Sequence, residues 1–551
     1  MPYTSGQERK RALSIDWKSL SPWAFGYVLL PIVLFALLWL RPAAGISVAL
    51  ATVAAGILAL GPAFLDRMPW LGSRAGWRGV KLPTPFARIS EGKDRSLQLG
   101  WKALLALVAV AVAWCFFGGQ GSMWAQSADW TVRNAVFQDL IVRPWPVVYD
   151  GGTTALVYYV NHWLVPASIA RVAFLVSGSA SLALELGNLL LLAWTSAGVL
   201  LVELFVLVLL KASNIKAMVF AIALLVLFSG MDALGLLMRL LFAAPDPSLA
   251  VWDQSNWSFM HLEWWAGEGA YQFSSNTTLL FWVFNQTVIP WLCTCMLLLS
   301  RSLSSAALLV VACLAAGPYA GVGLAVIALV LAGASLLENA REGSLGAWIR
   351  NLWSPVNILA VVPAIVYAAY FLCNQSIGTS GERLDAFGAL PGVDIATLAL
   401  FLFLEAGAYA AIVGTAFWRE PLFWAVGATL LAAPFIHIGS AYEFCCRATM
   451  PALFCLMLLC GAFLMKSASD HGSRSKGGRI AVWALVVCLA VGVVTPMVEF
   501  ARGAFAVFDK GVEGAVQAPS DLAGAKVEEG KPNNFKAVVH QDVLYFKLFA
   551  G

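Results

Sequence analysis

Long apolar stretches alternate with shorter polar segments along most of this chain of 551 residues. A helix needs about 20 consecutive apolar residues to cross the hydrocarbon core of a bilayer, so the pattern predicts about thirteen spans. The predicted spans lie near residues 22–41, 44–65, 99–118, 187–210, 214–235, 275–300, 303–318, 319–337, 353–373, 396–417, 421–437, 448–466 and 480–500. The two spans that meet at Gly317-Pro318 are short, and the total depends on them.

Composition supports this pattern. The chain is 60% hydrophobic and 12% charged, with a mean hydropathy of +0.78, whereas a soluble globular protein is typically about 25% charged. The predicted fold class is therefore an all-α polytopic membrane protein. The net charge of +4 is small and spread along the chain, which excludes nucleic acid as an expected partner. The ten cysteines show no metal-ligand spacing, so we expect them to be small buried apolar residues.

Lysine and arginine in short loops predict the orientation of the spans, because such loops stay in the cytoplasm. The basic segments are the N-terminus, which shows no cleavable signal peptide, and the loops 66–98, 338–351 and 466–479. Placing them all in the cytoplasm puts 119–186, 236–274, 374–395, 438–447 and the C-terminal tail outside. This orientation requires the apolar run 154–178, which contains His162 and Arg171, to be an interfacial helix rather than a span.

The first large external loop, 119–186, interleaves charged and aromatic side chains, as chains at the membrane–water interface do. Asp129 is the predicted general base of this loop. The alternative is a helix N-cap, because Asp129 precedes a good helix start, and both interpretations stay open. Asp139 lies nearly three helical turns further on and can share a face with Asp129 to bind substrate. Its alternative is an ion pair with Arg143 at i+4.

A second set of candidate side chains lies in and beside the external loop 236–274. His261 and Glu263 can bind the acceptor or a metal, although their spacing also suits an ordinary interfacial turn. Trp264 and Trp265 follow them directly, and Asp232 lies at the outer end of the preceding span. These residues are predicted to bind substrate.

Two arginines are candidates for binding a phosphate group. Arg447 lies where the span 448–466 begins, which suits a lipid headgroup, and the alternative is a side chain that snorkels to the interface. Arg171 is a similar but weaker candidate. Glu405 lies inside a predicted span, where a carboxylate is costly and usually paired or functional.

The chemistry open to such an external site is limited, because ATP and nucleotide sugars are absent there and the chain has no P-loop or Rossmann glycine pattern. A lipid-borne activated substrate is the natural alternative. Transfer from a lipid phosphate to a hydroxyl needs a carboxylate to take the acceptor proton, cations to hold the phosphate and aromatic rings to position the substrates. The external segments contain all three kinds of residue.

The layout resembles the GT-C superfamily of integral-membrane glycosyltransferases, which includes protein O-mannosyltransferases and the aminoarabinose transferases of lipid A. Several strings are also similar to a group of uncharacterised bacterial multi-span proteins grouped with that superfamily. The resemblance covers residues 99–465, and its strings are DWTVRNAVFQDLIVRPWPVVYD, LVYYVNHWLVPA, LFSGMDALG, HLEWWA, YQFSSNTTLLFWVFNQTVIPWL and YEFCCRATMPAL.

This resemblance implies a domain organisation. An addition of two spans (1–98) precedes a GT-C-like core (99–500), whose external loops are 119–186 and 236–274, and an external tail (501–551) follows. Two interfacial helices are implied at about 130–142 and 154–172, directly after the catalytic acid. The implied location is the bacterial inner membrane, with the N-terminus cytoplasmic and the C-terminus periplasmic.

The resemblance also implies inverting transfer of a sugar from a polyprenyl-phosphate donor to an envelope glycan, lipid or protein hydroxyl. Asp129 would deprotonate the acceptor, Arg447 with Arg171 or His261 would hold the phosphate, and Trp130, Trp264 and Trp265 would shape the sugar pocket. Many members of the superfamily carry an acidic pair where this chain has a single Asp followed by Trp. That departure leaves a requirement for a divalent metal, Mg²⁺ or Mn²⁺, open.

Other functions remain as alternatives. A transporter or flippase of lipid-linked glycan would place polar residues at the bilayer midplane on broken helices, and Glu203, Glu405 and the Gly317-Pro318 break keep it open. A glycan polymerase or ligase would use a large late external loop, but the late loop 374–395 is short and carries only Arg383. A non-catalytic scaffold of an envelope complex is a third alternative.

Overall fold

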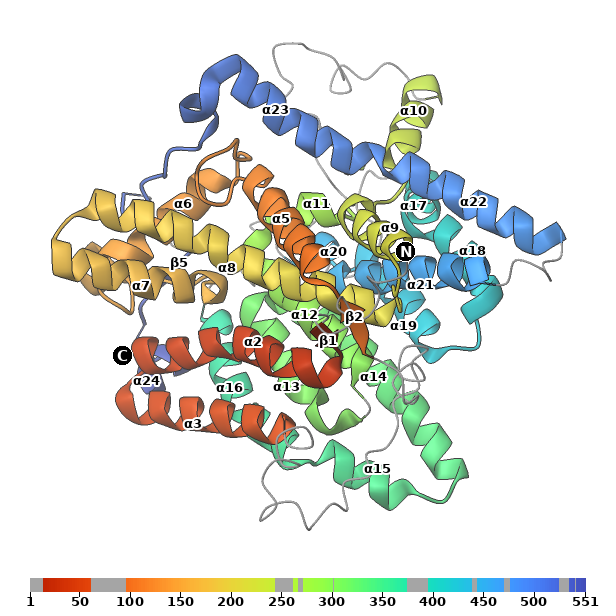
Figure 1. Ribbon diagram of the computed structural model, residues 1–551. Coiled ribbons are helices and arrows are strands. Elements are labelled where there is room, and N and C mark those ends of the chain that lie inside the picture. Colours follow the sequence, from red (N-terminus) through yellow and green to blue (C-terminus); the bar gives the residue numbers. More distant parts are fainter. Residues whose placement is uncertain are drawn as a thin grey trace, which may run out of the picture.

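A computed structural model of the protein shows an assembly that is mostly helical (Figure 1). The structure describes residues 13–60, 96–242, 261–265, 271–300, 302–373, 395–438, 443–469, 476–524, 535–540 and 542–551. Most of the predicted basic loop 66–98, the centre of the loop 236–274 and nearly all of the loop 374–395 lie outside these residues.

The helices match the predicted apolar runs closely. The longer ones are α2 (Trp17–Trp39), α3 (Pro42–Ala59), α5 (Trp101–Phe117), α6 (Trp130–Val142), α7 (Asn161–Ser177), α8 (Ala180–Leu209), α9 (Ile215–Leu227), α10 (Asp232–Phe242), α12 (Val288–Leu299), α13 (Ala306–Ala316), α14 (Pro318–Arg341), α16 (Pro355–Leu372), α18 (Ala408–Phe417), α19 (Pro421–Ala432), α21 (Met450–Ser469), α22 (Lys476–Gly492) and α23 (Val494–Ala515). The shorter ones are α11 (Asn276–Trp282), α15 (Leu345–Leu352), α17 (Ile395–Leu402), α20 (Glu443–Ala448) and α24 (Leu544–Leu548).

Within the described residues, 8 helices are long and apolar enough to cross a membrane, or up to 10 if each bent pair of helices counts as one span. This confirms a multi-pass, all-α membrane protein. The number of spans is lower than the predicted thirteen. Three predicted spans correspond to shorter apolar helices, at Trp101–Phe117, Leu303–Ala316 and Pro421–Phe435.

Two predicted spans are broken, and a third contains a π-helix. The pair formed by α9 and α10 bends by 47°, and α11 bends by 112° relative to Phe284–Leu299, a segment that begins with the 3₁₀ turn η6 (Phe284–Gln286) and continues into α12. The predicted span 396–417 has a π-helical turn, η9 (Phe403–Gly407), between α17 and α18. All residues of α12 are buried, so the second bend lies at the centre of the bundle.

The predicted first external loop folds as two helices and a hairpin. Helix α6 has the predicted bounds, and the strands β3 (Val148–Tyr149) and β4 (Thr154–Leu156) lead to α7. Helix α7 ends at the C-cap residue Gly178, and α8 begins two residues later. The backbone of Gly178 is left-handed (φ 70°), a conformation that glycine adopts at no steric cost. Helices α6 and α7 lie side by side (Figure 1). Helix α7 is not among the span candidates, and its interfacial position stays a prediction.

The N-terminal helices pack into the same hydrophobic core as the rest of the bundle. Helix α2 contacts α7, α8 and α12, and α3 contacts α16. A two-stranded antiparallel pair joins β1 (Leu13–Ile15) to β2 (Leu97–Leu99), which ties the start of α2 to the start of α5. The two helices of the predicted N-terminal addition therefore pack on the core as well as on each other.

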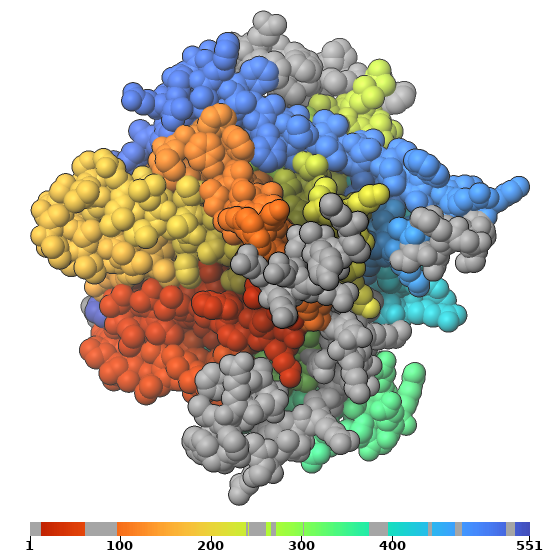
Figure 2. Space-filling view, viewed as in Figure 1, coloured from red at the N-terminus to blue at the C-terminus, as the bar shows by residue number. Residues whose placement is uncertain are grey.

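The C-terminal segment returns to the first external loop. Strand β5 (Lys536–Val538) pairs antiparallel with β4, so the sheet order is β3-β4-β5. After α23, the backbone N–H of Ser520 donates to the carbonyl of Thr131 in α6 (3.0 Å). Figure 2 shows α23 (blue) lying against the segment that contains α5 (orange). The predicted tail 501–551 therefore begins inside α23 and packs against α6 and β4.

Candidate functional site

The first candidate cluster begins at Asp129, the residue that precedes α6. Asp129 occupies the N-cap position, but its side chain makes no capping hydrogen bond. Instead Arg133, one turn along, donates from Nη2 to Asp129 Oδ2 at 2.9 Å. The Asp129 side chain is 47% exposed and that of Arg133 only 4%. The Asp129 carboxylate is therefore open to solvent on one side and paired with the buried guanidinium of Arg133 on the other.

Arg133 carries more hydrogen-bonding capacity than its described neighbours use. Its Nε and Nη1 atoms are buried, and neither has a hydrogen-bond partner among the described residues. Buried polar groups are almost always satisfied, so these two nitrogen atoms mark a place where water or a ligand oxygen can bind. Sequence reasoning missed Arg133, although its i+4 spacing from Asp129 was the available signal.

A second ion pair lies at the start of the α20–α21 segment. Arg447 Nη1 lies 3.3 Å from Glu443 Oε1, and the two side chains are 12% and 14% exposed. The Nε atom of Arg447 is buried and has no partner within the described part of the chain. Arg447 is thus a partly buried cation with one carboxylate neighbour, which is more specific than a side chain that snorkels to the surface.

Tyr158 shows that the two ion pairs lie near each other. Burial raises the pKa of its phenol, the guanidinium groups of Arg133 and Arg447 lower it, and the carboxylates of Asp129 and Glu443 raise it. All four charged groups therefore lie within electrostatic range of one hydroxyl. We call Asp129, Arg133, Tyr158, Glu443 and Arg447 the two-pair site. The predicted residues Asp129, which precedes α6, and Arg447, in α20, therefore both act electrostatically on Tyr158.

Trp130 anchors the two-pair site to the bend between α11 and α12. Its Nε1 atom donates to the carbonyl of Phe281 at 2.9 Å, and its ring stacks on Phe284 with centroids 4.5 Å apart. Trp163 contacts the same phenylalanine ring edge-on at 5.7 Å. Trp130 is buried, and these contacts fix the position of Asp129, the residue before it; its role in a sugar pocket stays a prediction.

A second cluster surrounds His261, on the other side of α11. The His261 ring stacks on Trp264 and meets Trp282 edge-on, each at 4.8 Å. Trp282 in turn donates from Nε1 to Glu499 at 2.8 Å. Burial and then the cation of Arg502 lower the pKa of His261 well below its usual value, so its imidazole is neutral.

Glu263 is buried and fully hydrogen-bonded. Its Oε1 accepts from the Ser275 backbone (2.8 Å) and the Thr278 hydroxyl (2.6 Å), and its Oε2 accepts from Gln272 (3.2 Å). Burial, followed by the negative charge of Asp232, raises the pKa of Glu263 to about 8. These contacts cap the start of α11, so Glu263 stabilises the bent segment.

Asp232 lies at the break between α9 and α10. Its Oδ2 accepts from Ser229 (3.0 Å) and Thr495 (2.8 Å). Glu405 packs against the same break so closely that a Cβ at Gly230 would lie 1.7 Å from its Oε2 atom, which requires glycine there. The ring of Trp265 packs against the following turn, 2.2 Å from where a Cβ at Gly235 would lie. Asp232 and Trp265 thus belong with Glu263 and not with the two-pair site.

Asp139 and Arg171 brace the far end of α6. Asp139 accepts from Arg143 Nε and from the Tyr149 hydroxyl, each at 2.8 Å. Arg171 donates from Nη1 to the carbonyls of Ile141 (3.2 Å) and Arg143, which satisfies carbonyls at the helix C-terminus. The i+4 ion pair that was the alternative for Asp139 is present, and neither residue belongs to the two-pair site.

A divalent cation does not fit the described donor atoms. Within the parts of the chain that the structure describes, no group of three His, Cys, Asp or Glu side chains could hold a metal ion. Each oxygen of Glu263 already accepts a hydrogen bond, and Asp129 and Glu443 are each paired with an arginine. No chemical step is therefore assigned to Mg²⁺ or Mn²⁺.

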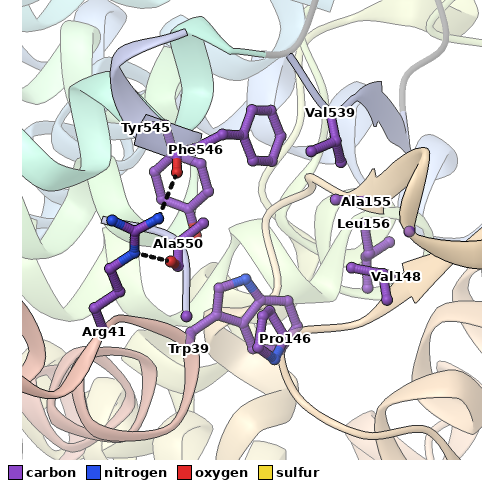
Figure 3. A pocket seen from close by; sticks show the side chains of 12 residues that line it. Trp39, Arg41, Pro146, Val148, Ala155, Leu156, Val539, Tyr545, Phe546 and Ala550 are labelled. Carbon is purple, nitrogen blue, oxygen red and sulfur yellow. Dashed lines mark hydrogen bonds between the residues drawn. The ribbon is translucent and has the colours of Figure 1, made fainter. Parts of the chain in front are cut away.

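One pocket of about 230 Å³ lies between the end of α2, the β3–β4 hairpin and the C-terminal residues (Figure 3). Trp39, Pro146 and Phe546 contribute to its lining. Arg41 donates to the carbonyls of Phe546 (3.3 Å), Lys547 (2.8 Å) and Ala550 (2.8 Å). None of the predicted site residues lines this pocket. Arg41 does line it, and its hydrogen bonds hold the end of α24 in place.

Comparisons with known proteins add no homologue to this description: no protein-family model, curated protein or solved structure matches the chain.

Proposed function

We propose that the protein is a membrane glycosyltransferase that moves a sugar from a polyprenyl-phosphate donor to a hydroxyl of an envelope glycan, lipid or protein. The two-pair site supports this proposal, because it combines a half-exposed carboxylate paired with a buried arginine, a second, partly buried arginine, and a phenol on which these charges act. A carboxylate can take a proton, and guanidinium groups bind phosphate oxygens through charge-assisted hydrogen bonds. The proposed location is the outer face of a bacterial inner membrane, with the N-terminus in the cytoplasm.

In the proposed reaction, the acceptor oxygen attacks the anomeric carbon from the face opposite the phosphate. The bond between that carbon and the phosphate oxygen breaks, so the configuration inverts and the polyprenyl phosphate leaves with the electron pair. Asp129 takes the acceptor proton. Arg447, with the free N–H groups of Arg133, stabilises the negative charge that develops on the leaving phosphate.

The test compares lipid-linked sugars and envelope glycans by mass spectrometry in source cells that lack the protein or carry wild type, Asp129→Asn or Asp150→Asn. Asp129→Asn is nearly isosteric and removes the base. Asp150→Asn is the matched control, because Asp150 is an exposed acid of the same loop whose φ of 52° asparagine tolerates. We expect Asp129→Asn to copy the null strain at normal membrane abundance, with accumulation of the donor. If the Asp129→Asn strain makes wild-type glycans, Asp129 is not the general base.

A transporter of lipid-linked glycan is the second candidate, and the broken helices favour it. The bend at α9–α10 and the π-helical turn meet at the buried side chains of Asp232 and Glu405, as in transporters with discontinuous helices. The sidedness of the accumulated lipid separates the candidates. Sphaeroplasts of the null strain hold the donor on the outer leaflet if a transferase is missing, and on the inner leaflet if a transporter is missing. Accessibility of the sugar to an external lectin or periodate distinguishes the two.

A further inference from the structure

Hydrogen bonds of Thr287 and of the backbone stabilise the bend between α11 and α12, and the polar side chains of Asn285 and Gln286 take no part in them. The hydroxyl of Thr287 donates to the carbonyls of Leu279 (3.1 Å) and Val283 (2.9 Å), which also accept from the backbone N–H groups of Val283 and Gln286. Backbone N–H groups of Gln286 and Thr287 close the turn on Val283 and Phe284. The side chains of Asn285 and Gln286 take no part in these bonds.

Asn285 and Gln286 are nevertheless buried, each with 1% of its surface exposed. None of the four polar atoms of these two amides has a hydrogen-bond partner among the described residues. An apolar residue would fill the same space at lower free energy, because burying an unsatisfied amide is unfavourable. Two adjacent unsatisfied amides therefore indicate a polar molecule that binds at the bend.

The bend contacts residues that lie next to the two halves of the two-pair site. Phe284, the residue before Asn285, stacks on Trp130, which follows Asp129 directly in the chain. On its other side, Gln286 packs against Gly317, whose Cβ position lies 3.3 Å from the Gln286 side chain. Helix α14 begins there, and its Tyr319 lies within electrostatic range of Glu443 and Arg447. The amides thus lie between the elements that carry Asp129 and Arg447.

We propose that Asn285 and Gln286 bind the sugar hydroxyls of the donor, and that this sugar is neutral. The inference rests on the proposed function and names its substrate class. Each amide offers both donors and an acceptor, which suits neighbouring hydroxyls. Neither amide carries a charge, so an amino sugar or an acidic sugar held by them would bury its charge there without a counter-ion. In the proposed reaction Arg133 and Arg447 bind the phosphate of the donor, and each is already paired with a carboxylate.

The test measures binding of three probes to the purified full-length protein in detergent micelles, by isothermal titration calorimetry. The probes are farnesyl phosphate, its neutral hexosyl ester (with glucose, galactose or mannose) and its 4-amino-4-deoxy-arabinosyl ester. The variants are Asn285→Leu and Gln286→Met, which keep the side-chain volume and remove the hydrogen-bonding groups. Asn351→Leu is the matched control, because that buried amide bonds, among the described residues, only to Ala347 in its own helix α15. Both test variants are expected to fold, because they replace unsatisfied amides with apolar groups.

We expect wild type to bind at least one neutral hexosyl ester about tenfold or more tightly than farnesyl phosphate, and the amino-sugar ester less tightly than that hexosyl ester. Each test variant should lose most of this gain and still bind farnesyl phosphate like wild type, whereas Asn351→Leu should change neither affinity. A gain that survives in both variants overturns the inference, and so does equal weakening of all probes. If wild type binds none of the three lipids, the proposed function itself fails.

Discussion

Replacing Arg133 with methionine separates stability from function at the two-pair site. The guanidinium is buried, and two of its nitrogen atoms have no partner in the described structure. Each unsatisfied buried N–H group costs about 1–3 kcal/mol. The ion pair to a carboxylate that is 47% exposed returns at most about 1 kcal/mol. Arg133 therefore lowers the stability of the folded protein by about 1 kcal/mol or more.

Arg133→Met removes this unfavourable term and keeps a side chain of similar length. Asp129 is not left as a buried charge, because water already reaches it. We expect the melting temperature in detergent micelles, followed by intrinsic tryptophan fluorescence, to rise by about 2 °C or more. The same variant should show the glycan defect of Asp129→Asn, because the phosphate loses a donor and the base loses its support.

The contrasting control is Arg171→Met. That guanidinium satisfies carbonyls at the end of α6, so its loss should lower the melting temperature. If Arg133→Met lowers the melting temperature as much as Arg171→Met does, the Arg133 guanidinium is structurally satisfied. In that case the unpaired nitrogen atoms of Arg133 are not a binding site for a substrate oxygen. Wild-type glycans in a stable Arg133→Met strain refute its proposed role directly.

Three further predictions concern the surrounding structure. The pKa of Glu263 is raised to about 8, from 4.5, so stability present below pH 4.5 is lost as the pH rises toward 8. Glu263→Gln should flatten this part of the curve of melting temperature against pH, and an unchanged curve contradicts the assignment. Gly323→Ala should sharply reduce the yield of folded protein, measured by size-exclusion chromatography, because its Cβ would lie 1.8 Å from the Ala448 carbonyl oxygen. Arg41→Ala should speed limited proteolysis at α24, because it removes three hydrogen bonds to that segment; an equal digestion rate argues against this anchor.

Local patterns predicted much of the fold. The bounds of about 130–142 that the resemblance implied for the first helix match α6. The second implied helix, 154–172, was wrong at both ends, because residues 154–156 form β4 and α7 runs from Asn161 to Ser177. The i+4 pair of Asp139 and Arg143 was foreseen because its spacing is local. Hydropathy gave the positions of the apolar helices but not the bend of 112° after α11. That bend depends on Thr287 reaching back to two carbonyls, which leaves no trace in a hydropathy pattern.

The candidate site was predicted only in part, because most of its contacts are long-range. Asp129 and Arg447 were chosen singly for their residue type and place near a span, and their proximity depends on how α6 and α20 pack. Asn285 and Gln286 lie inside the predicted span 275–300, and the sequence assigned them no role. They became candidates only because their buried amides have no hydrogen-bond partner among the described residues, and this can be recognised only from side-chain positions.

The strand order β3-β4-β5 also sets an order for biogenesis. Strand β4 precedes the segment that carries Tyr158, yet its partner β5 is synthesised only after the helices from α7 to α23. Until residue 538 has been synthesised, β4 keeps an unpaired edge, and the backbone bond from Val157 to Phe535 cannot form. The segment between α6 and α7 is therefore completed long after its own synthesis, and a chain that terminates before β5 carries an open strand edge that quality-control proteases can recognise.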